Sequence, residues 1–381
     1  MTHRVELDVR DNSLNLIRLV LALLVLVAHG YYLSGQGAGP SIQGENLGGW
    51  AVFGFFTISG YLITASRFAN PLGRFLVLRV ARIYPGFVVC LVLTAGVFAP
   101  VGWWVEGRDR SRFLTTDTTP VAYVLDNLGL RITAYDVAGT PASVPYPGAW
   151  NGSLWTLFFE FCCYLLVGLL VCLPVVRRHR WLLGVAFVAS VVVWANAGTW
   201  HLTDHADLAL FARLAPPFLG GAVVQVAVRR IPLRTSTALP AAALAVLVVA
   251  LVGGWGAQAA SPLIAYSLLW LATVLPSPRL VRRHDISYGA YVYAFPVQQL
   301  LAYAGAPRLG LVLYDALAMV GTGLLAVLSW RWVERPVLLC VRHRLGPRQS
   351  APGDSVVPEV TGGRPASVGE GPRHEGDRVR S

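Results

Sequence analysis

The chain has 381 residues, of which 55% are hydrophobic and 13% are charged, and it carries a formal net charge of +11 at pH 7. Soluble domains contain roughly 25% charged residues, so this composition argues against an ordinary soluble protein and favours a polytopic membrane protein. A positive charge is compatible with nucleic-acid binding. The arginines gather between apolar segments, however, which fits contact with the anionic cytoplasmic leaflet of a membrane better.

Apolar segments recur along the chain at the length that a membrane-spanning helix requires, about 20 residues. We predict an all-α bundle of about ten transmembrane helices. Nine or eleven helices remain as alternative counts, because only a weak turn signal separates the seventh span from the eighth. The predicted spans are residues 14–34, 48–66, 83–104, 152–173, 181–197, 207–228, 238–256, 260–276, 287–304 and 310–330.

The connections between these spans alternate in charge. One set is rich in arginine, whereas the short connections of the other set contain a single arginine, Arg308. Because cytoplasmic loops carry the excess of basic residues, both termini are expected in the cytoplasm of a cell membrane. The first span is longer than the apolar part of a signal peptide, so we expect it to be retained.

Three regions follow from this layout. We expect a cytoplasmic segment over residues 1–13, a membrane domain over 14–336 and a cytoplasmic tail, disordered by its composition, over 337–381. One outer connection, residues 105–150, is polar and long, and connections of that length are usually functional or disordered.

Ionisable residues inside a span are costly, so they are candidates for function. Arg18 and His29 lie eleven positions apart in the first span, on one stripe of the helix and about 16 Å apart along its axis. His29 is a plausible general base. The alternative is that Arg18 reaches the inner headgroups and His29 only bonds a neighbouring helix.

The fourth span contains Glu160, and Tyr164 lies one turn later on the same face. A charge at that depth needs a partner, and Arg213 near the outer end of the sixth span is the internal candidate. Ser153 stands where it can cap the fourth helix. The alternative for Glu160 is a role in helix packing alone.

Two further groups stand near the cytoplasmic half of the bundle. Ser59 belongs to a stretch with glycines that also permits close helix contact. Arg79 and Arg82 lie on one helical face, where two guanidinium groups suit phosphate binding, although they also fit ordinary anchoring at the inner leaflet.

A further cluster of histidine and aspartate occupies an outer connection, where nothing fixes its geometry, and we expect no metal site there. Its members are His201, Asp204, His205 and Asp207.

The order of these residues resembles the acyltransferase-3 family of bacterial membrane acyltransferases over about residues 14–336. The family often has a histidine two residues before the proline of the ninth span, and here that position, two residues before Pro296, is Ala294. The matching elements, in chain order, are Arg18 with His29, Phe55-Phe56-Thr57-Ile58-Ser59-Gly60-Tyr61, Arg79-Val80-Ala81-Arg82-Ile83-Tyr84-Pro85, Ser153-Leu154 through Glu160 and Tyr164, Ser287-Tyr288-Gly289-Ala290-Tyr291, and Glu334-Arg335-Pro336.

The resemblance implies transfer of an acyl group from acyl-CoA to a hydroxyl of a carbohydrate-type acceptor, either a cell-surface glycan or a glycosylated metabolite. It implies catalytic roles for His29, Glu160 and Arg18, and donor binding by Arg79, Arg82 and Arg18. Residues expected near the substrate are Ser59, Ser153, Tyr164 and Arg213. The alternative function is a transporter of a lipid-linked or acylated sugar, although the two halves of the chain show no repeat.

Overall fold

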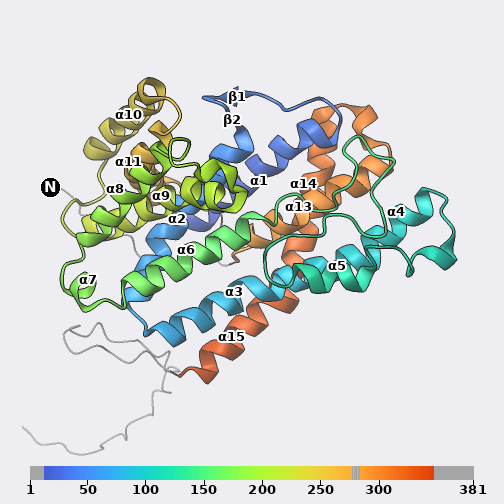
Figure 1. The fold of residues 1–381 in the computed structure, drawn as a ribbon, viewed down its shortest axis with the longest axis horizontal. Helices are drawn as coiled ribbons and strands as arrows, with labels where there is room; N and C mark the ends of the chain where they lie inside the picture. The colour runs from blue at the N-terminus through green and yellow to red at the C-terminus, as the bar shows by residue number, and fades with distance from the viewer. Residues whose placement is uncertain (1–12, 277, 279–280, 282–283, 347–381) are drawn as a thin grey trace, which may run out of the picture. The chain divides into compact units, whose positions relative to one another are not determined.

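In the computed structural model the chain is a bundle of α-helices, described for residues 13–276, 278, 281 and 284–346 (Figure 1). The long helices are α1 (Leu14–Leu33), α2 (Leu47–Phe68), α3 (Leu72–Leu93), α6 (Thr156–Leu170), α8 (Leu182–Ala195), α9 (Ala206–Ala227), α10 (Thr235–Val252), α11 (Gly256–Val274), α13 (Ser287–Tyr303) and α14 (Leu311–Ser329). Shorter elements are α4 (Ala99–Val105), α5 (Pro120–Asn127), α7 (Pro174–Arg178) and α15 (Arg335–Arg344).

Each of the ten predicted spans coincides with a long helix, so the all-α, multi-pass architecture is confirmed. Seven helical stretches within the described residues are long and apolar enough to cross a membrane, and α6 and α8 are shorter apolar helices. The remaining helix, α13, is less apolar because it carries tyrosine and glutamine, but every residue from Ser287 to Gln299 is buried against protein.

The third span begins earlier than predicted. α3 starts at Leu72 instead of residue 83 and continues through a π-helical turn, η1 (Thr94–Phe98), into α4. The arginines that interrupted the apolar run therefore lie on a helix and not in a connection. Arg74 donates to the carbonyl oxygens of Leu345 and Gly346 at 2.8 and 2.9 Å, which ties the start of α3 to the end of α15.

The region that follows α14 also differs from the prediction. α14 continues through the π-helical turn η5 (Trp330–Glu334) into α15, which packs beside α3 (Figure 1). The beginning of the predicted tail is therefore helical. The rest of that tail, from residue 347, and the predicted segment 1–12 lie outside the described residues.

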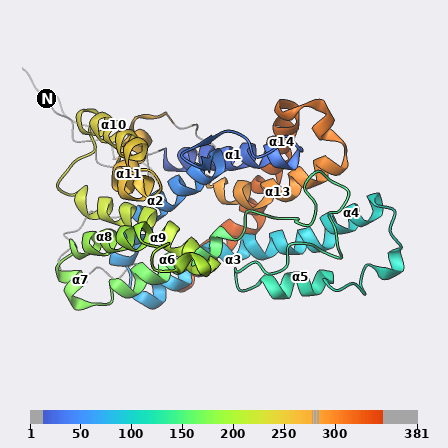
Figure 2. The same cartoon turned by 45° about the horizontal axis from the view of Figure 1, so that its top comes forward.

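α13 occupies the middle of the assembly that positions the site. It packs against α1, α14 and α3, while α2 packs against α1 and α9, and α10 pairs with α11 (Figure 2). Since α1 touches α2, α13 and α14, its inward side chains meet those of the other central helices.

Two connections on the side of the C-terminal end of α1 are folded. A hairpin of β1 (Ser41–Ile42) and β2 (Glu45–Asn46) leads into α2, whose first turn is capped by Asn46 accepting from Gly49 N at 2.8 Å. The long connection 105–150 contains α5 and a 3₁₀ turn at Arg110–Arg112, so of the two expectations for it, disorder is wrong.

Candidate active site

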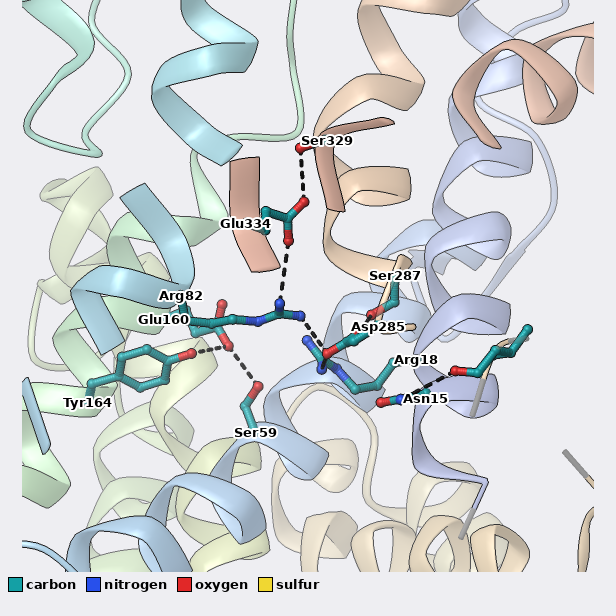
Figure 3. Close-up of polar contacts among 11 residues, drawn as sticks. Asn15, Arg18, Ser59, Arg82, Glu160, Tyr164, Asp285, Ser287, Ser329 and Glu334 are labelled. Atoms are coloured by element: carbon teal, nitrogen blue, oxygen red, sulfur yellow. Dashed lines mark hydrogen bonds and ion pairs between the residues drawn. The ribbon is translucent and has the colours of Figure 1, made fainter. Parts of the chain in front are cut away.

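A network of charged side chains joins α1, α3, the residues before α13, and η5 (Figure 3). Asp285 Oδ2 accepts hydrogen bonds from Arg18 Nη1 at 2.6 Å and from Arg82 Nη2 at 2.5 Å. Arg82 Nη1 also reaches Glu334 Oε2 at 3.4 Å. Two guanidinium groups and two carboxylates therefore compensate one another where the helices meet.

Further contacts hold this network in place. Ser287 Oγ donates to Asp285 Oδ1 at 2.6 Å, and Ser329 Oγ donates to Glu334 Oε1 at 2.9 Å. The guanidinium of Arg82 lies over the rings of Tyr288 and Trp330, at 5.6 and 5.4 Å from their centroids. Asp285, Arg82 and Glu334 are thus each oriented by more than one neighbour.

Asp285 was missing from the sequence-based candidates, and Glu334 appeared there only within a motif. A signal for Asp285 exists in the sequence: the arginine-rich connections over residues 66–82, 174–181, 229–237 and 276–286 contain one acidic residue between them, Asp285. An arginine buried among helices needs a carboxylate nearby, so that aspartate was the natural partner for Arg18.

Glu160 has hydroxyl partners. Its Oε1 accepts hydrogen bonds from Ser59 Oγ and Tyr164 Oη, each at 2.7 Å (Figure 3). The expected face shared with Tyr164 is confirmed. The expected pairing with Arg213 is wrong, because Arg213 forms an ion pair with Glu45 of the hairpin.

His29 lies apart from both groups. In the described part of the chain no hydrogen bond or ion pair joins it to Glu160, and its buried Nδ1 has no hydrogen-bond partner. Its ring makes edge contacts with Tyr32 and Phe295, at 5.5 and 5.2 Å between centroids. The imidazole is therefore held in place by aromatic packing, and it has no hydrogen bond at Nδ1.

Two cavities lie along the inward face of α1. The first, called here the His29 cavity, has a volume of about 300 Å³ and is lined by His29, Ser153, Arg213, Trp50, Trp155 and Trp194, among others. The second, the Arg18 chamber, has about 40 Å³ and is lined by Arg18, Glu160, Ser287 and Tyr288, among others. Residues on α1, α2, α6 and α13 thus bring together groups that are far apart in the sequence.

Several candidates take positions that the sequence did not predict. Ser153 does not cap the fourth span, because α6 begins at Thr156 without a side-chain cap. Its Oγ instead donates to Asn151 Oδ1 at 3.1 Å beside the His29 cavity. Arg79 shares the α3 face of Arg82, but its buried Nε has no hydrogen-bond partner among the described residues.

The histidine and aspartate cluster of the outer connection is divided between different contacts. His201 lies near Asp204, at 3.3 Å between Nδ1 and Oδ2. Asp207 pairs with Arg131 at 2.9 Å instead. Within the described residues no group of three or more such side chains is placed to hold a metal ion.

Comparison of the sequence with known proteins shows to which family the chain belongs. A family model described as an acyltransferase domain matches residues 11–331. The chain belongs to the acyltransferase-3 family. It is 29% identical over 336 residues to an O-acetyl transferase of Shigella phage Sf6, covering 86% of this chain and 96% of that protein.

A second relative of this acyltransferase is Nodulation protein 10 of Rhizobium leguminosarum bv. viciae, with 29% identity over 353 residues, covering 86% of this chain and 93% of the relative. No solved structure matches the chain. The protein is therefore a multi-pass membrane O-acyltransferase, and the membership favours an enzyme over the alternative of a transporter.

Proposed function

We propose that the enzyme transfers an acyl group from acyl-CoA, supplied from the cytoplasm, to a hydroxyl of a carbohydrate-type acceptor in the His29 cavity. The observation that carries the proposal is the meeting of two cavities along α1, one beside His29 and the other beside Arg18 and Glu160. Such an arrangement can bring a donor and an acceptor together from different sides.

The donor enters on the arginine-rich side. Arg18 and Arg82 are already paired with carboxylates, so they shape the entrance and leave less charge for a ligand. Among the described residues Arg79 forms no ion pair with a carboxylate, which makes it the stronger candidate for a donor phosphate. The Arg18 chamber holds only a few water molecules at its present volume, so side chains must move to admit a thioester arm.

His29 acts as the general base. It takes the proton of the acceptor hydroxyl while that oxygen attacks the thioester carbonyl carbon. A carbon–oxygen bond forms, the carbon–sulfur bond breaks, and the proton passes from His29 to the departing sulfur. Positioned proton transfer of this kind contributes about 10²–10⁴-fold to the rate.

Glu160 binds the acyl-CoA donor in this proposal. It lines the Arg18 chamber while Ser59 and Tyr164 hold one of its oxygens, so its carboxylate is fixed towards the arm of the donor. A fixed acceptor of hydrogen bonds suits the amide N–H groups of a pantetheine arm. In this assignment Ser59 and Tyr164 position Glu160 and do not touch the reacting atoms.

The lining of the His29 cavity supports a sugar as the acceptor. Its walls combine flat aromatic side chains with polar groups, including Trp50, Trp155, Ser153 and the pair formed by Arg213 and Glu45. Its volume of about 300 Å³ lies in the range of sites for small ligands. A cell-surface glycan and a glycosylated metabolite both fit this chemistry.

Replacing His29 by alanine tests the function. We expect the His29→Ala protein to lose about 10²–10⁴-fold in acyl transfer because the acceptor proton has no base. The reaction is followed by mass spectrometry of the acceptor, with acetyl-CoA and a panel of glycosides, using purified protein in lipid nanodiscs.

His201→Ala is the matched control, because that histidine is exposed in an outer connection, with 82% of its side chain accessible. It should transfer at the wild-type rate. Unchanged acyl transfer by a folded His29→Ala protein would refute the catalytic assignment, and an acceptor that never gains an acyl mass would refute the proposed reaction.

A further inference from the structure

The His29 cavity and the Arg18 chamber share one wall. Val52 of α2, Thr156 of α6 and Tyr291 of α13 line both spaces. This layer, called here the septum, consists of side chains from three helices. His29 stands on one side of it, and Arg18 and Glu160 stand on the other.

Tyr291 is the part of the septum with the most defined contacts. Its hydroxyl donates to the carbonyl oxygen of Ser153 at 2.9 Å and lies 2.6 Å from Thr156 Oγ1. Thr156 Oγ1 also donates to Ser153 O, at 3.2 Å. These contacts hold Tyr291 of α13 against the start of α6.

The ring of Tyr291 is equally confined. Phe55, which lines the Arg18 chamber, meets it edge-on at 5.7 Å between centroids. Only 8% of Tyr291 is exposed. Opening the septum therefore requires the ring to turn and its hydroxyl to leave Ser153 and Thr156.

A closed septum has a chemical use in an acyltransferase. Water in the His29 cavity can attack a thioester carbonyl, forming a carboxylic acid while the carbon–sulfur bond breaks and the sulfur takes the proton. Excluding water from a reactive group prevents such side reactions. The groups of the septum lie where the donor carbonyl must pass to reach an acceptor beside His29.

We propose that Tyr291 is a gate that separates the donor thioester from water in the acceptor cavity and opens when an acceptor is bound. This inference rests on the proposed function. It assigns to Tyr291 a positioning role, in which its hydroxyl keeps the ring across the opening. The consequence is that loss of the hydroxyl uncouples donor cleavage from acyl transfer.

The experiment compares two rates in nanodiscs with acetyl-CoA: release of the free CoA thiol without acceptor, and formation of the acylated glycoside with acceptor. One lost hydrogen bond shifts an equilibrium by about tenfold, so Tyr291→Phe should release thiol without acceptor about tenfold faster than wild type. Thr156→Val, which removes the partner hydroxyl, should act in the same direction.

Tyr293→Phe is the matched control. Tyr293 lies two residues further along α13 and contacts Ser329 Oγ at 3.4 Å. It lines neither the His29 cavity nor the Arg18 chamber. The Tyr293→Phe substitution should leave the ratio of thiol release to acyl transfer unchanged.

The outcomes are distinguishable. A purely structural role lowers both rates of Tyr291→Phe together, and an unchanged ratio of thiol release to transfer overturns the gate while leaving the proposed function intact. If the wild-type protein neither transfers the acetyl group nor releases thiol, the proposed function fails and the gate fails with it. Thermal unfolding of each variant shows that the compared proteins are folded.

Discussion

Asp285 balances the charge of two arginines that come from different helices. Burial alone raises the pKa of this carboxyl, but the adjacent charges of Arg18 and Arg82 outweigh burial and hold the pKa below its ordinary value. The carboxylate therefore stays ionised at neutral pH. Because Arg82 also reaches Glu334, a change at Asp285 affects the whole network.

Replacing Asp285 by asparagine removes the charge but keeps the shape. We expect Asp285→Asn to lower the free energy of unfolding by about 3 kcal/mol, since it leaves Arg18 without a carboxylate partner and Arg82 with Glu334 alone. Ser287→Ala, which removes one hydrogen bond to Asp285, should cost only about 1 kcal/mol. Thermal unfolding in detergent measures both, and equal shifts would contradict the importance of the charge.

The pH dependence of this difference has a definite sign. A carboxyl whose pKa is lowered by folding contributes stability above its unfolded pKa and loses it as the pH falls through the folded pKa. The difference in the free energy of unfolding between wild type and Asp285→Asn should therefore stay constant from about pH 8 to about pH 5 and disappear only in strong acid. If this difference in stability disappeared near neutral pH, the ion pairing would be disproved.

At the scale of elements, the contact between α2 and α9 is unusually close. A Cβ atom added at Gly60 would lie 1.8 Å from the carbonyl oxygen of Phe218, and one at Gly221 would lie 1.9 Å from that of Thr57. Small residues let membrane helices approach backbone to backbone. This approach fixes α2, whose Ser59 holds Glu160.

A single methyl group should disrupt this contact. We expect Gly60→Ala to reduce the yield of folded protein strongly, because neither backbone can move away without opening the bundle. Gly184→Ala in α8 is the control, since its Cβ would meet nothing within 4 Å. Size-exclusion chromatography of the solubilised proteins compares them, and equal yields would show that the two helices can separate.

At the scale of the whole molecule, the distribution of arginine predicts the orientation in the membrane. The connection after α9 carries Arg229, Arg230 and Arg234, and the connection after α13 carries Arg308 alone. From the positive-inside rule we predict that the first lies in the cytoplasm and the second outside, with both chain ends inside. The donor and acceptor sides of the proposed reaction depend on this orientation.

Single cysteines test the orientation. In a background without the exposed Cys172 and Cys340, a membrane-impermeant maleimide should label Arg308→Cys in intact cells. Arg230→Cys should react only after the cells are opened. Both arginines are exposed, so access is limited by the membrane alone. The reverse labelling pattern would invert the proposed sides of donor and acceptor.

The sequence by itself determined where the helices lie, because an apolar run of about 20 residues that ends at arginines leaves the backbone no other way to satisfy its hydrogen bonds in a membrane. It also placed Arg18 and His29 on one stripe and Glu160 beside Tyr164, since helical geometry is local. It misplaced the start of α3, where arginines interrupt the apolar run but bond to the end of α15.

Only the tertiary structure decided which groups meet. Arg18 pairs with Asp285, 267 positions away, and Arg213 pairs with Glu45 instead of Glu160. The septum likewise combines α2, α6 and α13. The periodicity of a helix gives the face on which a side chain lies but not the helix that this face meets, and charge partners are chosen by proximity between helices.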